Sequence, residues 1–416
     1  MNKWIFFVSC LLAASASHAQ GLVDLQQNAL ANRAIIQRYQ LNFEKSRKDI
    51  QMGKSGFYPG ADLSYTINIL DDSSLLEDRE NSSFYGGIRY NLFNGFHDRY
   101  ALQNTRLLSE VEAHRLQGIK QDIMHNVAQR YLEIFSRRAA LQVAKDSRDN
   151  LQKVYADAAN RFQVGMLRKN ELLKFRVDLD NADITLKKAE ASLRKSVLLL
   201  EREIDARIVL ENLQFSEFDI LPTLDDPEQL ENEMYEKRSE LKALAMMHDA
   251  ALAQIEMQSA AKYPAVNLSA GYSSYDDALI NGIGDKREDE IRGRLTVTMN
   301  LFDGYAKEAR IGKAEIEARA LSYDLEEAKK DLAAVLHTIY LDYQISRDNI
   351  AVAERSIEQA EENLRVTRLA YREGMERESD LLDAIANLSR AKYNFVAAKS
   401  DFFANSFQLT RMVDGF

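Results

Sequence analysis

Apolar and polar residues alternate in four short segments of the chain. From Ala61 to Ile69, within a predicted strand of about 61–70, the odd-numbered positions are apolar and the even-numbered ones are polar, and the alternation returns over about 84–92. Two later segments, about 265–273 and 291–301, repeat it. Because successive side chains of a strand point to opposite faces, each segment predicts a β-strand with one apolar and one polar face.

Long helices are predicted directly after the second and fourth of these strands. From Gly95 to Gln163 and from Gly304 to Glu373 there is no proline and almost no glycine, so each stretch can extend as one helix for ~100 Å. Asn94 and Asp303, which precede the first glycine of each stretch, are expected to be N-caps.

A glycine then ends each long helix. After Gly165 a second helical stretch follows over about 171–200, and after Gly374 another follows over about 379–409. Glycine suits the left-handed conformation that ends a helix before a tight reversal. The pattern therefore predicts two long helical hairpins with tips near Gly165 and Gly374.

The strands and hairpins belong to a tandem repeat. Asn91–Gly95 recurs as Asn300–Gly304, 209 positions later (300 − 91), with aspartate in place of the second asparagine. Two copies follow, residues 20–203 and 227–416, each with a first helix, two strands and a hairpin. The segment 204–226 between them looks like a connector rather than part of a core.

The first 19 residues predict a secretory signal peptide. Lys3 precedes an apolar run from Trp4 to Ala14, and Ser17-His18-Ala19 matches a small-x-small cleavage site. Cys10, the only cysteine, lies inside that run, too near the N-terminus for a lipoprotein cleavage site. The mature chain is therefore expected to have no disulfide and no cysteine metal site.

Composition narrows the class of protein. The formal net charge is -10, which argues against a nucleic-acid-binding protein and leaves cationic solutes or basic partner surfaces open. No stretch after the signal has the ~18 consecutive apolar residues of a membrane-spanning helix. If the chain enters a membrane, it is expected to do so as strands closed into a barrel.

Each alternating segment alone is also compatible with an ordinary half-buried strand. Four equivalent segments behind an export signal favour outer-membrane barrel strands, with apolar side chains toward lipid and polar ones toward a lumen. The smallest such barrels use ~8 strands, so four cannot enclose a lumen. Closure therefore predicts a ring of identical subunits.

These features resemble the TolC-type outer-membrane efflux protein family over essentially the whole mature chain. The resemblance rests on the repeat, on the junctions Asn91–Gly95 and Asn300–Gly304, and on the tips at 162–166 and 371–374. It implies a mainly α protein with membrane β: a trimeric twelve-stranded β-barrel, four strands per protomer, continued by a long α-helical coiled-coil tunnel in the periplasm. The implied partners are a homotrimer, a periplasmic adaptor (membrane fusion protein), an inner-membrane pump of RND or ABC type, and outer-membrane lipid.

The resemblance also assigns candidate entrance residues. Asp380 and Asp383, spaced i, i+3 on one helix face, occupy the positions of the family's periplasmic entrance acids. The alternative for such acids is that they complement the helix dipole. Tyr371 and Glu171 match the tyrosine and acid that tie neighbouring hairpins shut, whereas Glu376 replaces the usual basic partner.

Two further sets of residues are candidates for contacts. The tips are expected to dock the adaptor, although turn geometry alone also explains the glycines. Arg89, Arg292 and Arg294 are candidates for the barrel lumen, with a position at the periplasmic rim as the alternative. The tip candidates are Val164, Gly165, Met166, Gly374 and Met375.

No pattern indicates an enzyme, a metal site or a cofactor. The histidines after the signal are scattered, without metal-ligand spacing or a nucleophile motif. The favoured function is therefore the passive exit duct, in the outer membrane, of a tripartite efflux pump or a type I secretion system. The alternatives are a periplasmic coiled-coil adaptor or scaffold and, more distantly, an outer-membrane enzyme.

Overall fold

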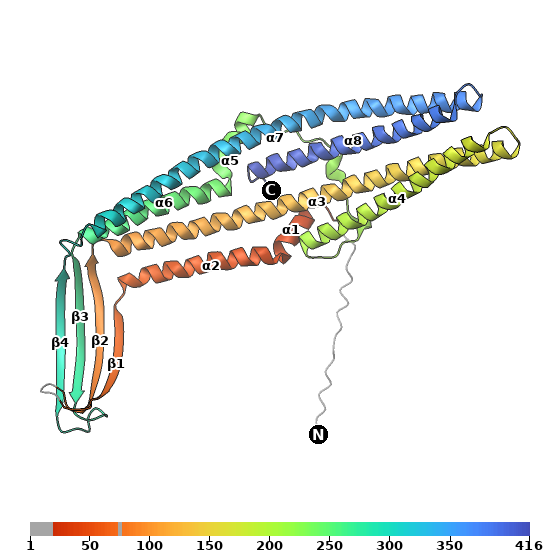
Figure 1. Ribbon diagram of the computed structural model, residues 1–416. Helices are drawn as coiled ribbons and strands as arrows, with labels where there is room; N and C mark the ends of the chain where they lie inside the picture. Colours follow the sequence, from red (N-terminus) through yellow and green to blue (C-terminus); the bar gives the residue numbers. More distant parts are fainter. Residues whose placement is uncertain (1–19, 74–76) are drawn as a thin grey trace, which may run out of the picture. The chain divides into compact units, whose positions relative to one another are not determined.

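The computed structural model describes residues 20–73 and 77–416 (Figure 1). The predicted signal peptide, with Cys10, lies outside the described residues. Short 3-10 turns occupy Ser55–Phe57, Leu210–Asn212, Ser216–Phe218 and Ala260–Lys262. The helices are α1 (Leu22–Asn32), α2 (Ala34–Lys54), α3 (His97–Gln163), α4 (Lys169–Ile204), α5 (Pro227–Lys237), α6 (Ser239–Ser259), α7 (Ala306–Arg372) and α8 (Glu378–Met412).

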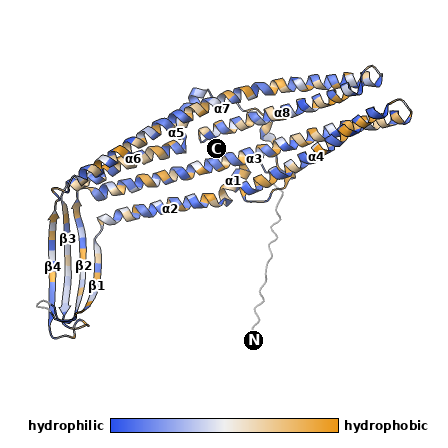
Figure 2. Ribbon diagram, viewed as in Figure 1, coloured by the Kyte–Doolittle hydropathy of each residue, from blue (hydrophilic) through white to orange (hydrophobic). Residues whose placement is uncertain are grey.

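The chain divides into two compact units. The strand unit comprises residues 35–119 and 235–333 and holds the sheet, α2, α6 and the first parts of α3 and α7. The tip unit comprises residues 20–34, 120–234 and 334–416 of the described chain. Figure 2 shows hydrophilic and hydrophobic residues interspersed along the labelled helices, and none of those described is both long and apolar enough to cross a membrane.

The four strands form one antiparallel sheet in the order β1-β2-β3-β4. They are β1 (Gly60–Ile69), β2 (Glu80–Asn94), β3 (Ala265–Asp276) and β4 (Arg287–Thr298). The fourth strand ends before the predicted limit of Leu301, because β3 begins at Ala265, which pairs with Thr298. Beyond that pair β3 offers no partner.

The register confirms the alternation of faces. Leu63 of β1 lies opposite Gly86, Gly86 lies opposite Tyr272 of β3, and Tyr272 lies opposite Ile291 of β4. Directly opposed residues share a face, so the apolar positions of all four strands lie on the same side of the sheet. This side is open in the single chain, where Leu63 is 75% and Ile291 is 85% exposed.

The strand-to-helix junctions are built alike in both repeats. Gly95 and Phe96 have φ of 67° and 68°, and Gly304 and Tyr305 have 70° and 67°. The side-chain oxygens of Asn94 and Asp303 then accept the backbone N–H of Asp98 and Lys307, at 3.4 and 3.3 Å. Asn94 and Asp303 are not the N-cap residues themselves, because two left-handed residues separate each of them from its helix, but their side chains still accept an N–H of the first turn.

Helices of the strand unit are joined by two polar contacts, one buried and one partly buried. The hydroxyl groups of Ser46 on α2 and Ser109 on α3 lie 2.9 Å apart. The Asn104 amide on α3 donates to the carbonyl of Ala250 on α6 at 2.7 Å. Because a buried polar group is costly unless it is paired, these contacts favour one packing of the helices.

In the tip unit, α3 with α4 and α7 with α8 form the two predicted hairpins (Figure 1). All four helices contribute apolar side chains to one core, in which Phe175 of α4 is fully buried and Leu381 of α8 is 2% exposed. Other members are Leu151 and Val154 of α3, Leu364 and Tyr371 of α7, and Ile385 of α8.

The segment 204–226, interpreted as a connector, also contributes buried residues to the core, among them Leu213 and Phe218. Phe218 is fully buried, and its ring centroid lies 4.7 Å from that of Phe135 on α3 and 4.8 Å from that of Phe403 on α8. The hydroxyl of Tyr131 donates to Glu217 at 3.3 Å. The segment therefore closes the hydrophobic cluster between α3 and α8.

Candidate functional site

The two tips have the same backbone geometry. Gly165 and Gly374 adopt φ of 78° and 75°, the left-handed conformation predicted for them. In each tip, the amide after the glycine donates to a carbonyl five residues earlier, at 2.8 Å in the first and 2.9 Å in the second. This pattern is a Schellman motif. It leaves Val164, Met166 and Met375 exposed at 68%, 79% and 73%.

Asp380 lies in the first turn of α8, directly behind the second tip. Its carboxylate accepts the backbone N–H of Arg377 at 3.2 Å. An acid at this point caps the helix and complements its dipole. The contact fixes the side chain on the first turn of α8.

Asp383 lies one turn further along α8 and lines an open groove of about 480 Å³ together with Asp178 of α4. Burial raises the pKa of Asp178, and the negative charge of Asp383 raises it further. The structure therefore brings together two carboxylates from different repeats. Asp178 carries no signal in the sequence, because its importance depends on the packing of α4 against α8.

Tyr371 lies in the last turn of α7 with its ring in the core, and it is only 8% exposed. The ring packs edge-on against Phe175 at 6.2 Å, and the Arg161 guanidinium lies over it at 5.4 Å. Burial is the main cause of the raised pKa of Tyr371. Its hydroxyl has no hydrogen-bond partner within the described chain, so no hydrogen bond joins it to Glu171 in this protomer.

A different pair connects the hairpins near the tips. Lys174 of α4 donates to Glu378 of α8 at 2.5 Å, and this contact lowers the pKa of Glu378. Lys174 stands nine positions after Gly165, as Asp383 stands nine positions after Gly374. The repeat offset could therefore have singled out Lys174 in the sequence.

The three candidate arginines of the sheet share its polar face. Ser269 of β3 is paired with Arg89 on one side and with Arg294 on the other, and Arg292 lies two residues before Arg294. Arg89 forms an ion pair with Asp62 at 2.7 Å. Arg292 donates to both carboxylate oxygens of Glu290, at 2.6 and 2.7 Å.

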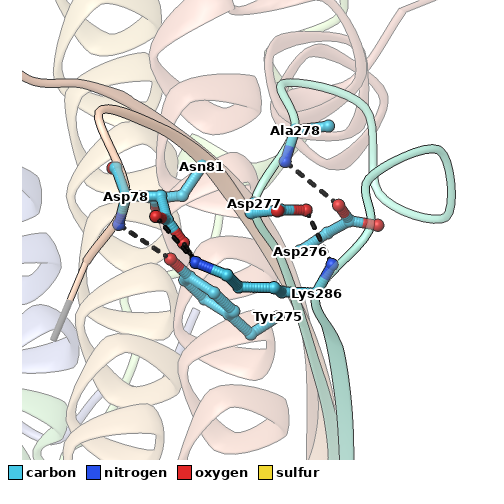
Figure 3. A network of polar contacts seen from close by, with 7 residues as sticks. All are labelled: Asp78, Asn81, Tyr275, Asp276, Asp277, Ala278 and Lys286. Atoms are coloured by element: carbon cyan, nitrogen blue, oxygen red, sulfur yellow. Dashed lines mark hydrogen bonds and ion pairs between the residues drawn. The ribbon is translucent and has the colours of Figure 1, made fainter. Parts of the chain in front are cut away.

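A polar network orders the loop between β3 and β4 (Figure 3). The fully buried Asp276 accepts the amides of Ala278 at 3.0 Å and Gly282 at 2.5 Å. Lys286 forms an ion pair at 3.2 Å with Asp78, which lies between β1 and β2. The two loops are therefore tied together, which the sequence did not reveal.

No set of three or more His, Cys, Asp or Glu side chains in residues 20–73 and 77–416 is arranged to hold a metal ion. The polar contacts described above are of three kinds: ion pairs such as Lys174–Glu378, the helix cap at Asp380, and the contacts that hold the loop between β3 and β4.

Comparison with known proteins covers nearly the whole chain. The family model "Outer membrane efflux protein" matches residues 25–203 and 230–415. The chain is 23% identical to Outer membrane protein TolC of Vibrio cholerae serotype O1 over 424 aligned positions, which cover 98% of this chain and 94% of that protein.

Solved structures share the fold. The outer membrane protein VceC of Vibrio cholerae matches with a TM-score of 0.80 and 15% identity, over 95% of this chain and 96% of that one. CusC matches with a TM-score of 0.82 and 17% identity, over 95% and 92%. The family match covers both repeats, and it decides against the adaptor or scaffold and against the enzyme. The chain therefore belongs to the outer membrane efflux protein family, as a TolC-type protein of the outer membrane whose helical part lies in the periplasm.

Proposed function

We propose that this outer-membrane efflux duct works as a homotrimer in a tripartite efflux pump or a type I secretion system. Substrates pass through it without being chemically changed, and the energy comes from an inner-membrane pump of RND or ABC type. A periplasmic adaptor joins that pump to the duct.

The observation that carries the proposal is the open sheet. In the described chain β1 pairs only with β2, and β4 pairs only with β3, so each outer strand has one free edge. No residue of β4 is buried. Free edges and an exposed apolar face are unsuitable for lipid unless the sheet closes. Pairing β4 of one copy with β1 of the next would close twelve strands around the polar face.

The polar face supports a water-filled lumen. Arg89, Arg292 and Arg294 would then point into the barrel, each beside polar or acidic neighbours. Such side chains tune which solutes a pore admits.

The tips support an entrance at the ends of the hairpins. Asp380 and Asp383 of three copies would form rings of carboxylates, which favour cations. Tyr371 and Glu171 would contribute to closing this entrance between hairpins. The exposed Val164, Met166 and Met375, with Gly165 and Gly374, would receive the adaptor.

The test of the duct is the conductance of the purified protein. Native mass measurement in detergent is expected to give a trimer, and planar bilayers are expected to show channels of one size. A monomer that stays soluble without detergent would reject the proposal.

The entrance is tested by the double variant Asp380→Ala with Asp383→Ala. We expect block by a multivalent cation applied from the periplasmic side to weaken about tenfold or more, because six carboxylates per trimer are lost. The control replaces two exposed acids of the 204–226 segment, Glu211→Ala with Asp225→Ala, and keeps the same net charge. Equal block in both double variants would remove Asp380 and Asp383 from the entrance.

A further inference from the structure

A second, smaller cavity lies beside Tyr371 in the tip unit. It has a volume of about 140 Å³ and lies where α3 and α7 meet. Its polar lining consists of Lys153 and Asp157 from α3 and Arg368, Tyr371 and Arg372 from α7.

Two hydrogen-bond donors in this lining lack acceptors. The Tyr371 hydroxyl and the Arg368 Nε are both buried, and neither has a hydrogen-bond partner in the described chain. Tyr371 as a whole is more than nine-tenths buried. Buried donors are rarely left unpaired in proteins, and a charged donor is the most costly to leave so.

The charges around the cavity do not balance. Lys153, Arg368 and Arg372 supply three positive charges. The only acid of the lining, Asp157, is engaged by Arg161 at 3.2 Å. Two acids outside the lining, Glu171 and Glu378, also act on Tyr371, and Lys174 engages Glu378. The cavity therefore combines a net positive lining with two buried donors that have no partner in the described chain, and this combination is complementary to an anion. Burial raises the pKa of Tyr371, so its hydroxyl stays protonated and can donate.

The hairpin fold does not require these residues. At the equivalent positions of the first repeat, 209 residues earlier, Ala159 replaces Arg368, Phe162 replaces Tyr371 and Gln163 replaces Arg372. That hairpin nevertheless forms the same turn. The tyrosine and the two arginines are therefore specific to the second tip.

We propose that this cavity binds one small monovalent anion, a halide or a carboxylate, between α3 and α7. The anion accepts hydrogen bonds from Arg368 Nε and from the Tyr371 hydroxyl. A guanidinium can donate hydrogen bonds to an anion from the side that carries its Nε–H. Lys153 and Arg372 add charge, so the anion links the two hairpins of one protomer. This site does not depend on the proposed transport function.

The first test uses crystals of the detergent-solubilised protein grown in sodium bromide. Wild type is expected to show an anomalous bromide peak within hydrogen-bond distance of Arg368 Nε and the Tyr371 hydroxyl. Tyr371→Phe and Arg368→Ala, which copy the first repeat, are expected to lose it. The control Arg365→Ala removes a guanidinium that Glu362 already holds at 2.7 Å, and it is expected to keep the peak.

The second test measures thermal stability in solution. Raising sodium bromide, or sodium acetate in a parallel series, is expected to raise the Tm of wild type more than that of Tyr371→Phe. The substitution leaves the charge unchanged, so general screening by salt is the same in both proteins. Loss of one hydrogen bond to the anion is expected to weaken binding about tenfold. Equal shifts in the two proteins, or no peak in wild type, would show that water satisfies these donors and would overturn the site.

Discussion

The two hairpin tips share a backbone and differ in surface. Both turn through a left-handed glycine with φ within 3° of each other, at 78° and 75°. The first tip is largely apolar, with Phe162, Val164 and Leu167, whereas the second has Tyr371, Glu373 and Glu376 in the same places. The turn therefore requires only the glycine, and the neighbouring side chains are free to differ.

This difference in side chains determines which hairpin carries the candidate functional residues. Both unpaired donors of the cavity, Arg368 and Tyr371, come from the second hairpin. The second hairpin also has the two acids that follow its glycine at six and nine positions. At those positions the first hairpin has Glu171 and Lys174. The duplication thus gives two hairpins with the same turn, and the second hairpin carries most of the candidate functional residues.

The largest effect is expected from replacing the tip glycines. Gly165→Val and Gly374→Val should each lower the free energy of unfolding by about 1–3 kcal/mol, because a β-branched residue is strained at positive φ. Space is not the cause, since a Cβ at either glycine would meet nothing within 4 Å. Chemical unfolding in detergent measures the effect.

Gly312→Ala is the matched control. Gly312 lies inside α7, and a Cβ there also has open space, so alanine should raise the free energy of unfolding by about 0.5–1 kcal/mol. If Gly165→Val and Gly374→Val are equally destabilising but only the second abolishes transport, the second tip has the specialised contact. Equal loss of transport would assign both glycines the same role.

Features that depend on neighbours in sequence could be predicted. The alternation over 61–69 fixes which side chains share a face, and one residue type, glycine, marks each tip. The ends of the strands are less well predicted from the sequence, because the end of β4 depends on where its partner β3 begins.

Features that depend on packing between distant segments could not be predicted. Phe218 is one of two phenylalanines in a segment that also holds a proline and several acids, and only its contacts with Phe135 and Phe403 show that it belongs to the core. Asp178 is likewise one of several acids on α4, and its proximity to Asp383 follows from helix packing. The burial of Tyr371 in the core also depends on packing between hairpins, and its predicted role with Glu171 in closing the entrance stays a prediction.

An intermediate effect on the free energy of unfolding is expected at the groove that Asp178 and Asp383 line. In the folded protein the pKa of Asp178 is raised, so ionisation of this group opposes folding. The resulting loss of folding free energy is absent below the ordinary pKa of aspartate, where Asp178 is protonated in both the folded and the unfolded state. It grows as the pH rises from that ordinary pKa through the raised pKa of the folded state. Asp178→Asn should therefore stabilise the protein at neutral pH, by up to about 1 kcal/mol for a partly exposed pair, and the gain should vanish near pH 3.

Asp383→Asn is the matched test of the same pair. It should give part of the same gain, and the double variant should gain less than the two single variants together, because either change removes the repulsion. Additive gains would show that the two carboxylates do not interact. Thermal unfolding followed between pH 3 and 8 provides the measurement.

The smallest effect is expected from giving the first tip the tyrosine of the second. Phe162 is 38% exposed, so the hydroxyl of Phe162→Tyr can reach water, and the free energy of unfolding should change by less than about 0.5 kcal/mol. Without counterparts of Arg368 and Arg372, the new tyrosine should also add no dependence of the Tm on bromide. A bromide-dependent gain in this variant would mean that a tip tyrosine alone suffices to hold an anion, and it would remove the distinction between the two tips that the cavity implies.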